Sequence, residues 1–430
     1  MKVAYFSPLP PEPSGIADYS AHLLPALRRR IEVVVARRGS KRRPRGADVS
    51  VYHIGNNADA HAWIVDAYRR DPGLVVLHDV VLHHLVAGIT IGRGRSDEYL
   101  DAMQRDSGVL GRLLAHGVLD GVLPSLWEDR AADFPLTMWV VEAATGVIVH
   151  SRFAEARLRE LGFTRPIWRI PMPAWPVPAS EPPSQRDEIV IGCFGHMNTA
   201  KRIPELLNAF ARLRERRPGT KLILGGSASA GLDVEQLILE RGLEGSVDRH
   251  GYLDEDELWR LIAESDVLVS LRHPTMGETS GMVVRALSIG KPIVVSDLGW
   301  FAELPDEVVL KIPVDERETE ALDDVLERLA GDPDLRGRMS RAAAEWARRE
   351  HDLETAAELY VAAIEESAGA RDVERSVVGD VARAAAEVGL TAEAPELNDV
   401  AERLRDAGLG GSDRAVEQGP APNGRGTLHR

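Results

Sequence analysis

The stretch LRHPTMGETSGMVVRALSIGKP, residues 271–292, shows the alternation of elements from which the chain is built. A short apolar strand ends at Leu271, a polar loop follows, and a helix is predicted over residues 279–289. The free amides and the positive dipole end of a helix N-terminus attract anions. Because Arg272 and Glu278 flank this N-terminus, the loop suits a phosphate that is attached to a sugar. A second interpretation is that Thr279 and Ser280 only cap the helix.

Similar short apolar strands, separated by helical stretches, occur on both sides of this segment. Such strands are typical of a parallel sheet that helices cover on both faces. The sequence therefore predicts an α/β fold with two doubly wound, Rossmann-like parallel sheets. The predicted strands are residues 3–6, 31–36, 49–54, 74–77 and 146–150 in the first sheet, and 189–194, 221–224, 247–250, 267–271 and 292–296 in the second.

A proline-rich segment separates the two sheets. Residues 171–184 contain six prolines, which exclude a helix or a central strand. We expect a cleft between the two domains, with functional residues in the loops that follow the strands. The predicted parts are an N-terminal domain (1–170), a linker (171–187), a C-terminal domain (188–350), a C-terminal helix that packs back towards the N-terminal domain (351–370), and an Ala/Glu-rich helical extension with a disordered tail (371–430).

The composition of the 430 residues excludes several classes of protein. Hydrophobic residues make up 44% and charged residues 28%, as in a globular protein with a buried core. One cysteine excludes an internal disulfide framework and fits a reducing compartment. No apolar run has the roughly 18 residues of a membrane span. The net charge of -15 argues against nucleic acid as a partner. These features predict a cytoplasmic protein.

The charge is unevenly distributed, because residues 1–46 hold ten Lys and Arg against three acidic residues. One interpretation of the basic segment, residues 28–45, is a helix C-terminus with favourable cations followed by a solvated loop. The other is a patch for anionic lipid headgroups, which would place the protein peripherally at the inner face of the membrane.

The segment around Glu278 resembles the signature of the retaining family 4 (group 1) glycosyltransferases, which have the two-domain GT-B fold. Their signature is a Glu, seven residues, a second Glu and a helix of small residues that ends in Gly-x-Pro. The resemblance extends over roughly residues 1–365. It implies a nucleotide-diphosphate sugar as donor, a glycan, lipid-linked or small-molecule acceptor, and no metal or other cofactor. The matching positions are Glu278, Gly281, Ala286, Gly290 and Pro292.

The resemblance assigns the donor to the C-terminal domain. Lys201 and Arg272 would hold the diphosphate together with the amides at the helix N-terminus, and Glu278 would bind the sugar hydroxyls. His196 stands where the family usually has Arg, and the plainer interpretation of Lys201 is a solvated helix lysine. The amides are those of Thr279, Ser280, Gly281 and Met282.

Four N-terminal positions complete the implied site. Gly15 resembles the family's glycine-rich loop, which approaches the donor phosphates and the acceptor. His78 resembles the strand-ending histidine near the anomeric carbon, although a helix cap with a satisfied imidazole is the alternative. Asp18 and Asn57 would lie on the acceptor side. His83 and His84 lack further ligands for a metal site, and we interpret both as structural.

The sequence departs from the family pattern at Arg285, which replaces the second Glu one residue earlier than the usual spacing. An arginine cannot accept hydrogen bonds from the ribose hydroxyls that this Glu typically binds. Either another carboxylate, with Glu303 as a candidate, takes its place, or the donor is held differently. This departure leaves open a non-catalytic relative that binds a nucleotide or glycan in the same cleft.

Overall fold

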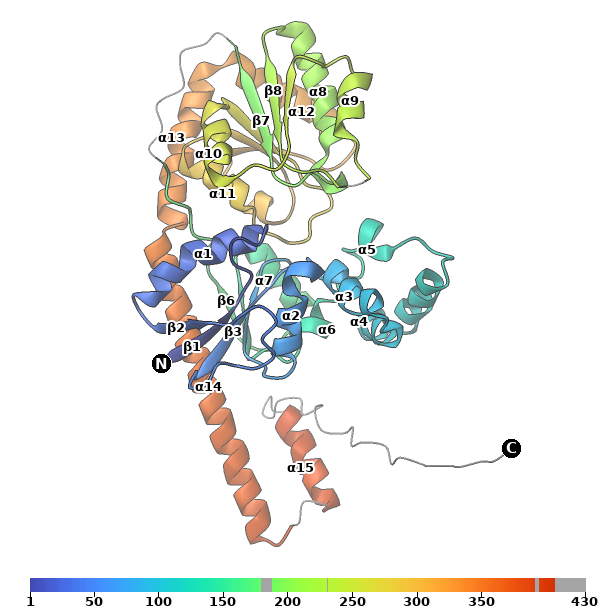
Figure 1. Ribbon diagram of the computed structural model, residues 1–430, viewed down its shortest axis with the longest axis vertical. Helices are drawn as coiled ribbons and strands as arrows, with labels where there is room; N and C mark the ends of the chain where they lie inside the picture. Colours follow the sequence, from blue (N-terminus) through green and yellow to red (C-terminus); the bar gives the residue numbers. More distant parts are fainter. Residues whose placement is uncertain (179–187, 230, 391–393, 407–430) are drawn as a thin grey trace, which may run out of the picture.

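The computed structural model describes residues 1–178, 188–229, 231–390 and 394–406 and contains two α/β domains (Figure 1). Each domain is built on a sheet of six strands whose pairings are all parallel. The predicted fold class, with two doubly wound parallel sheets, is therefore confirmed. The C-terminal domain is at the top of Figure 1 and the N-terminal domain is below it.

The first sheet has the strand order β2-β1-β3-β4-β5-β6. Its strands are β1 (Lys2–Phe6), β2 (Glu32–Val35), β3 (Val49–Ile54), β4 (Leu74–Leu77), β5 (Gly146–Val149) and β6 (Ile167–Arg169). The helices of this domain are α1 (Gly15–Arg28), α2 (Ala58–Tyr68), α3 (His83–Ile89), η1 (Ile91–Arg93), α4 (Ser96–Leu119), α5 (Leu126–Asp129), α6 (Thr137–Val141) and α7 (Arg152–Glu160).

The second sheet has the order β12-β11-β10-β7-β8-β9. Its strands are β7 (Val190–Phe194), β8 (Lys221–Gly225), β9 (Val247–His250), β10 (Val267–Ser270), β11 (Ile293–Ser296) and β12 (Val309–Ile312). Its helices are η2 (Thr199–Lys201), α8 (Ile203–Arg216), α9 (Val234–Glu240), α10 (Glu255–Glu264), α11 (Gly281–Ser288), η3 (Gly299–Glu303), α12 (Glu318–Gly331) and α13 (Pro333–Glu350). The chain ends in α14 (Leu353–Glu387) and α15 (Pro395–Asp406).

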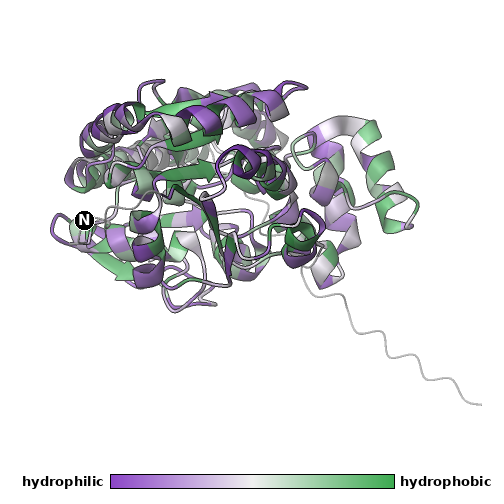
Figure 2. Cartoon of the chain, turned by 90° about the horizontal axis from the view of Figure 1, so that it is seen from above, coloured by the Kyte–Doolittle hydropathy of each residue, from purple (hydrophilic) through white to green (hydrophobic). Residues whose placement is uncertain are grey.

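The central strands form because their residues are apolar on both faces. All four residues of β4 and all five of β7 are buried. Figure 2 shows hydrophobic strands in the interior and hydrophilic residues on the outer faces of the surrounding helices. The prediction missed β6 and β12, which lie at the sheet edges and carry Arg169 and Lys311, because a short strand with a charged residue lacks the continuous apolar pattern.

The strand order reverses once in each sheet, between β1 and β3 in the first and between β7 and β10 in the second. At such a point the loops after neighbouring strands diverge and leave a crevice outside the strands' carboxyl ends. The candidate residues Gly15 and Asn57 follow β1 and β3, and Lys201 and Arg272 follow β7 and β10. The topology therefore gathers the sequence-derived candidates at these two crevices.

The first half of the predicted linker is packed into the protein. Met172, Pro173 and Trp175 are buried, and the Nδ1 atom of His351 lies 2.5 Å from the carbonyl oxygen of Met172. The amide of Ala174 also donates to the carbonyl of His351, at 2.7 Å. The two segments that cross between the domains are thus hydrogen-bonded to each other. Residues 179–187 lie outside the described part of the chain.

Helix α14 continues without interruption through residue 370, the predicted boundary between the C-terminal helix and its extension. Its first turns pack on α1 of the N-terminal domain, where the hydroxyls of Tyr360 and Tyr19 are 2.6 Å apart and both rings are buried. Glu354 and Glu358 form ion pairs with Arg30. The tail expected to be disordered, from residue 408 onward, lies outside the described residues.

Replacing Tyr360 with phenylalanine is expected to lower the free energy of unfolding by about 1–3 kcal/mol, because the buried hydroxyl of Tyr19 loses its partner. Chemical denaturation measures this change. The matched control is Leu359→Ala, whose side chain is 42% exposed on the same helix turn and should change stability little. Equal stability of Tyr360→Phe and the parent would show that the contact contributes nothing.

The basic segment makes several ion pairs within the protein. Arg29 and Arg30 bind Glu354, Arg38 binds Glu12, and Arg43 binds Asp71. These ion pairs neutralise part of the positive charge of the basic segment within the protein itself. Membrane contact through residues 28–45 stays a prediction. In the described residues, no helix has the length and apolarity needed to cross a bilayer.

Candidate active site

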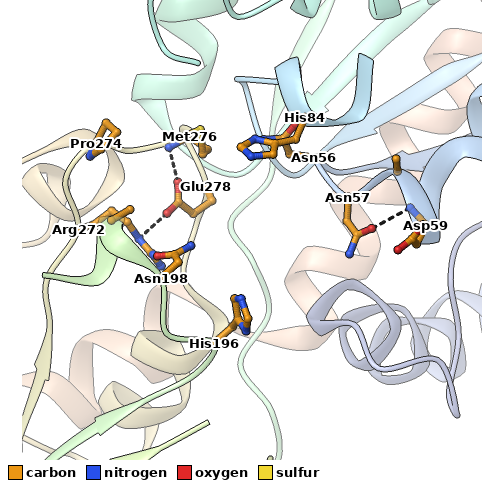
Figure 3. Close-up of a pocket in the computed structure, with 12 residues that line it drawn as sticks. Asn56, Asn57, Asp59, His84, His196, Asn198, Arg272, Pro274, Met276 and Glu278 are labelled. Atoms are coloured by element: carbon orange, nitrogen blue, oxygen red, sulfur yellow. Dashed lines mark hydrogen bonds and ion pairs between the residues drawn. The ribbon is translucent and has the colours of Figure 1, made fainter. Parts of the chain in front are cut away.

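A pocket of about 480 Å³ lies between the two domains, and Figure 3 shows the side chains around it. This volume falls within the range of about 300–1,000 Å³ that is usual for small-molecule sites. The N-terminal domain contributes residues after β3 and at the start of α3, and the C-terminal domain contributes residues after β7 and β10. The lining residues are Asn56, Asn57, Ala58, Asp59, His84, His196, Asn198, Ala200, Arg272, Pro274, Met276 and Glu278.

The loop after β10 supplies a cation and a carboxylate to this pocket. The Nε atom of Arg272 lies 2.7 Å from an oxygen of Glu278, and both side chains are largely buried. The other oxygen of Glu278 accepts hydrogen bonds from the Thr275 hydroxyl at 3.0 Å and the Met276 amide at 2.8 Å. The carboxylate is therefore held in one orientation, and it orients the guanidinium beside it.

The same loop is fixed to the N-terminal domain. The amides of Val80 and Val81 both donate to the carbonyl of Met276, at 2.8 and 2.9 Å. Gly277 has a φ of +78°, and a Cβ added there would lie 2.8 Å from the Cβ of Val80. Only glycine fits both this backbone conformation and this close approach. The candidate residues of the C-terminal domain are thus placed against the segment that follows β4.

The opposite wall of the pocket comes from the loop between β3 and α2. Asn57 caps α2 by accepting from the amides of Asp59 and Ala60. Asn56 is held on both sides, because its amide donates to Asp79 at 2.8 Å and its side-chain oxygen accepts from the amide of Leu85 at 3.1 Å. Asn57, predicted on the acceptor side, therefore faces the Arg272–Glu278 pair across the pocket (Figure 3).

The sequence prediction missed several residues of this wall and its surroundings. We interpreted His84 as structural, but it lines the pocket, while its neighbour His83 is buried and bonded to Tyr99. Asn198 also lines the pocket, and its buried side-chain oxygen has no hydrogen-bond partner. His84 belongs to no motif, and only its position at the start of a helix could have drawn attention to it. Asn198 lies between His196 and Lys201 in the segment that resembles the family, but the resemblance assigned it no role.

Asp79 lies behind the pocket wall and carries an unusual carboxyl group. Burial raises its pKa from 3.8 to about 7, and the negative charge of Glu278 acts in the same direction. The Asn56 amide and the Arg272 guanidinium oppose this shift. The folded protein therefore binds a proton on Asp79 at pH values at which the unfolded chain has released it.

This linkage predicts that Asp79 contributes stability below pH 3.8, and that the contribution is lost as the pH rises to about 7. Asparagine at position 79 keeps an oxygen for the Asn56 amide but does not titrate. The free energy of unfolding of Asp79→Asn should therefore rise relative to that of the parent between these pH values. Denaturant titrations at a series of pH values measure the difference, and a constant difference would contradict the assignment.

His78 lies beneath the site in a cluster of aromatic rings and does not line the pocket. Its Nε2 atom is 3.0 Å from Nδ1 of His53, and the ring packs edge-on against Tyr19 at 5.0 Å. The ring of His150 lies 5.1 Å away. Burial, followed by the neighbouring histidines, holds the pKa of His78 well below its usual value. The ring is therefore neutral at pH 7, and His53 occupies one of its two nitrogens.

Lys201 is not the solvated helix lysine of the plainer interpretation. It lies in η2, one turn before α8, and its buried ammonium donates to the carbonyl of Phe194. A Cβ added at Gly195, which has a φ of +102°, would lie 2.9 Å from the Lys201 nitrogen. Burial, aided by the positive charge of Arg272, lowers the pKa of Lys201 to about 8. The ammonium lies beneath the turn that follows β7 and is absent from the pocket lining.

The N-terminus of α11 also lies apart from the pocket lining. The helix begins at Gly281, two residues later than expected, with Ser280 as its cap. The side chain of Ser280 accepts from the amide of Val283, and Thr279 is buried. The indole of Trp175 lies against this end of the helix. A Cβ added at Gly281 would come within 3.0 Å of the indole ring. Gly281 and Met282 contribute the amides of the first turn.

Arg285 stacks on Trp175 with its guanidinium carbon 3.7 Å from the ring centroid. The Trp175 ring also stacks on the ring of His22 in α1, at 5.7 Å between centroids. Glu255 lies 3.8 Å from Arg285. Asp18 also lies near this guanidinium. Burial raises the pKa of the Asp18 carboxyl, and the positive charge of Arg285 opposes that rise. Arg285 thus joins α11 to the linker and faces α1.

Two other candidates have different surroundings. Glu303 caps α7, accepting from the amides of Arg152 at 3.0 Å and Phe153 at 2.6 Å, and lies outside the pocket lining. The carboxylates beside Arg285 are instead Glu255 and Asp18. Gly15 starts α1 in an exposed position, and a side chain there would meet no atom within 4 Å. Within the described ranges, no group of three or more His, Cys, Asp or Glu side chains is placed to hold a metal ion.

Two Rossmann-like domains that face a pocket at their strand ends define the GT-B class of proteins, and this part of the resemblance is confirmed. The fold is similar to Anabaena Alr3699/HepE in complex with UDP-glucose, with a TM-score of 0.58 and 17% identity over 85% of this chain and 100% of that chain. It is also similar to sucrose-phosphate synthase of Thermosynechococcus elongatus, with a TM-score of 0.57 and 18% identity over 85% and 98% of the two chains.

Residues 179–346 match the family model of glycosyl transferases group 1, which confirms the family resemblance for this part of the chain. An alpha-D-kanosaminyltransferase of Streptomyces kanamyceticus is 27% identical over 159 residues, 37% of this chain and 40% of that protein. A D-inositol 3-phosphate glycosyltransferase of Arthrobacter sp. (strain FB24) is 33% identical over 155 residues, 35% and 36% of the two chains. The match thus spans well under half the length of these curated relatives.

Proposed function

We propose that the protein is a retaining, metal-independent glycosyltransferase that moves a sugar from a nucleotide-diphosphate donor to a glycan, lipid-linked or small-molecule acceptor. The observation that carries this proposal is the Arg272–Glu278 pair, which is fixed at the strand end of β10 and faces Asn57 and His84 across the pocket. The guanidinium of Arg272 is suited to a phosphate and the carboxylate of Glu278 to sugar hydroxyls, and the two groups lie 2.7 Å apart.

In the transfer, the bond between the anomeric carbon and the diphosphate oxygen breaks, and a bond to the acceptor oxygen forms with the same configuration. The diphosphate oxygen gains negative charge as its bond to the sugar breaks, and it can accept the proton that the acceptor hydroxyl loses. Arg272 would stabilise this charge from the pocket wall, and Lys201 would support it from beneath the Gly195 turn. Fixed cations of this kind are typically the largest contribution to such a reaction.

The neutral His78 would orient the sugar near the reacting carbon, because His53 fixes one ring nitrogen and leaves the other for a ligand. The acceptor would approach from the side of Gly15, Asp18 and Asn57. The amides of residues 279–282 would join the diphosphate site once Trp175 moves from the end of α11. The UDP-glucose bound to the similar Anabaena protein supports a nucleotide-diphosphate sugar as donor.

Thermal unfolding in the presence of nucleoside diphosphates and nucleotide sugars, with and without a chelator, tests the proposal. A ligand at about a hundred times its dissociation constant adds about 2.7 kcal/mol to the free energy of unfolding. We expect a clear rise in melting temperature with one nucleotide family, unchanged by the chelator. No rise with any nucleotide would favour the non-catalytic alternative, and a rise that the chelator abolishes would contradict metal independence.

A further inference from the structure

The wall that the N-terminal domain contributes to the candidate active site carries no lysine or arginine among the described residues. This N-terminal wall consists of Asn56, Asn57, Ala58, Asp59 and His84. The arginine of the pocket lining, Arg272, comes from the C-terminal domain and is paired with Glu278 at 2.7 Å. Once the donor diphosphate binds Arg272, the lining offers no second guanidinium or ammonium for another anion.

The helix N-termini on this wall are already capped by side chains of the protein. The side-chain oxygen of Asn57 accepts from the amides of Asp59 and Ala60 at the start of α2. The side-chain oxygen of Asn56 accepts from the amide of Leu85, in the first turn of α3, at 3.1 Å. Free amides at a helix N-terminus attract a phosphate. Here these amides have partners, so neither helix offers them to an anionic ligand.

Asp59 adds a negative charge to the same wall. It lies in the first turn of α2, is exposed and lines the pocket (Figure 3). Arg38 donates to the main-chain carbonyl of Asp59 at 2.8 Å, not to its carboxylate, and forms an ion pair with Glu12. The charge of the Asp59 carboxylate therefore acts on any ligand that enters from this side.

The polar groups left on the wall are of the kind that binds hydroxyls. Because the oxygens of Asn56 and Asn57 accept from helix amides, their NH₂ groups are the donors left for a ligand, and the Asp59 carboxylate is an acceptor. A hydroxyl group both donates and accepts, so it matches these groups. A phosphate monoester carries about two negative charges at neutral pH and would meet the carboxylate without a cation.

We propose that the acceptor is neutral at the end that reacts, a sugar or other polyol without a phosphate beside the reacting hydroxyl, and that Asp59 selects against phosphorylated forms. This inference rests on the proposed glycosyltransferase function and specifies the class of its acceptor. Since Asp59 is exposed, salt screens its charge, and the discrimination should become smaller as the ionic strength rises.

Initial rates with matched acceptors test this inference, after thermal unfolding has identified the donor. The acceptors are glucose, mannose, N-acetylglucosamine, myo-inositol and glycerol, each compared with its phosphate monoester. We expect transfer to at least one neutral compound. Its phosphorylated form should have a kcat/KM about tenfold lower or less, the effect of one like charge at a few ångströms near a protein surface. Addition of NaCl should reduce the difference.

A charge-reversal variant assigns the discrimination to one residue. Asp59→Lys should raise kcat/KM for the phosphorylated form, relative to the neutral one, about tenfold or more. The matched control is Asp97→Lys, which removes an exposed carboxylate from the first turn of α4, outside the pocket lining, and should keep the ratio of the parent. Both variants lose a favourable interaction with a helix N-terminus, so that effect is common to them. If Asp59→Lys does not fold, Asp59→Asn should change the ratio in the same direction.

The outcomes separate this inference from the proposed function. If no nucleotide binds, the proposed function fails. If the donor binds but phosphorylated acceptors react faster than their neutral forms, or none of the neutral compounds reacts, only the inference about the acceptor is overturned. An unchanged ratio in both Asp59 variants, or an equal change in Asp97→Lys, would remove Asp59 as the specificity-determining residue.

Discussion

Replacing Arg272 with alanine is expected to slow sugar transfer by about 10²–10³-fold, the usual effect of removing one fixed electrostatic stabiliser. The guanidinium is held by Glu278 at 2.7 Å, and the Arg272 amide donates to Ser296 at 2.8 Å. Little reorganisation is therefore needed when charge develops on the leaving diphosphate. Glu278 keeps its bonds to Thr275 and Met276 in the variant, so the loop should stay folded.

Initial rates with the donor identified by thermal unfolding measure this effect. The matched control is Arg37→Ala, which removes an exposed arginine outside the pocket. Its rate should equal that of the parent. A lowered donor affinity with unchanged turnover would make Arg272 a binding residue only, and an unchanged rate at all donor concentrations would remove it from the site.

Replacing His78 with alanine is expected to lower turnover by about 10²–10³-fold, on the scale of losing a preorganised polar group, while the affinity for the nucleoside diphosphate changes less. The imidazole contacts the rings of His53, Tyr19 and His150 and is fixed in one orientation. The alanine variant loses this fixed group near the sugar but keeps Lys201 and Arg272 for the phosphates.

The control for lost stability is His83→Phe, which removes another buried, hydrogen-bonded histidine of the same domain. Both variants should be less stable than the parent, but only His78→Ala should lose turnover. Calorimetry with the nucleoside diphosphate measures affinity separately from rate. Should affinity fall while turnover stays constant, His78 would be a binding residue; equal losses of turnover in both variants would indicate a general effect of lost packing.

The parts of the fold that depend on local patterns could be predicted from the sequence. The strand at residues 74–77 has the predicted bounds, because its apolar run LVVL, which ends at His78, specifies it locally. The placement of Arg272 and Glu278 in a loop after a strand follows from the same pattern. Both residues do line the pocket.

The contacts between distant segments could not be predicted in this way. Trp175 belongs to a proline-rich stretch whose composition predicts a linker, yet its ring stacks with both His22 and Arg285, which lie in different domains. Lys201 has the expected position in the chain, but the turn at Gly195 buries its ammonium. The first contact depends on how the two domains lie relative to each other, and the second on how a loop folds over a side chain. Composition and spacing carry no information about either.

The Tyr360–Tyr19 contact has a consequence for the order in which the molecule can form during synthesis. The buried core that contains Tyr5 and Tyr19 of the N-terminal domain also contains Tyr360 and Ile364 of α14. Domains generally fold as units while the chain emerges from the ribosome. The first domain to be translated must therefore wait for one of the last helices, and the second domain can complete its sheet before the first can close its core.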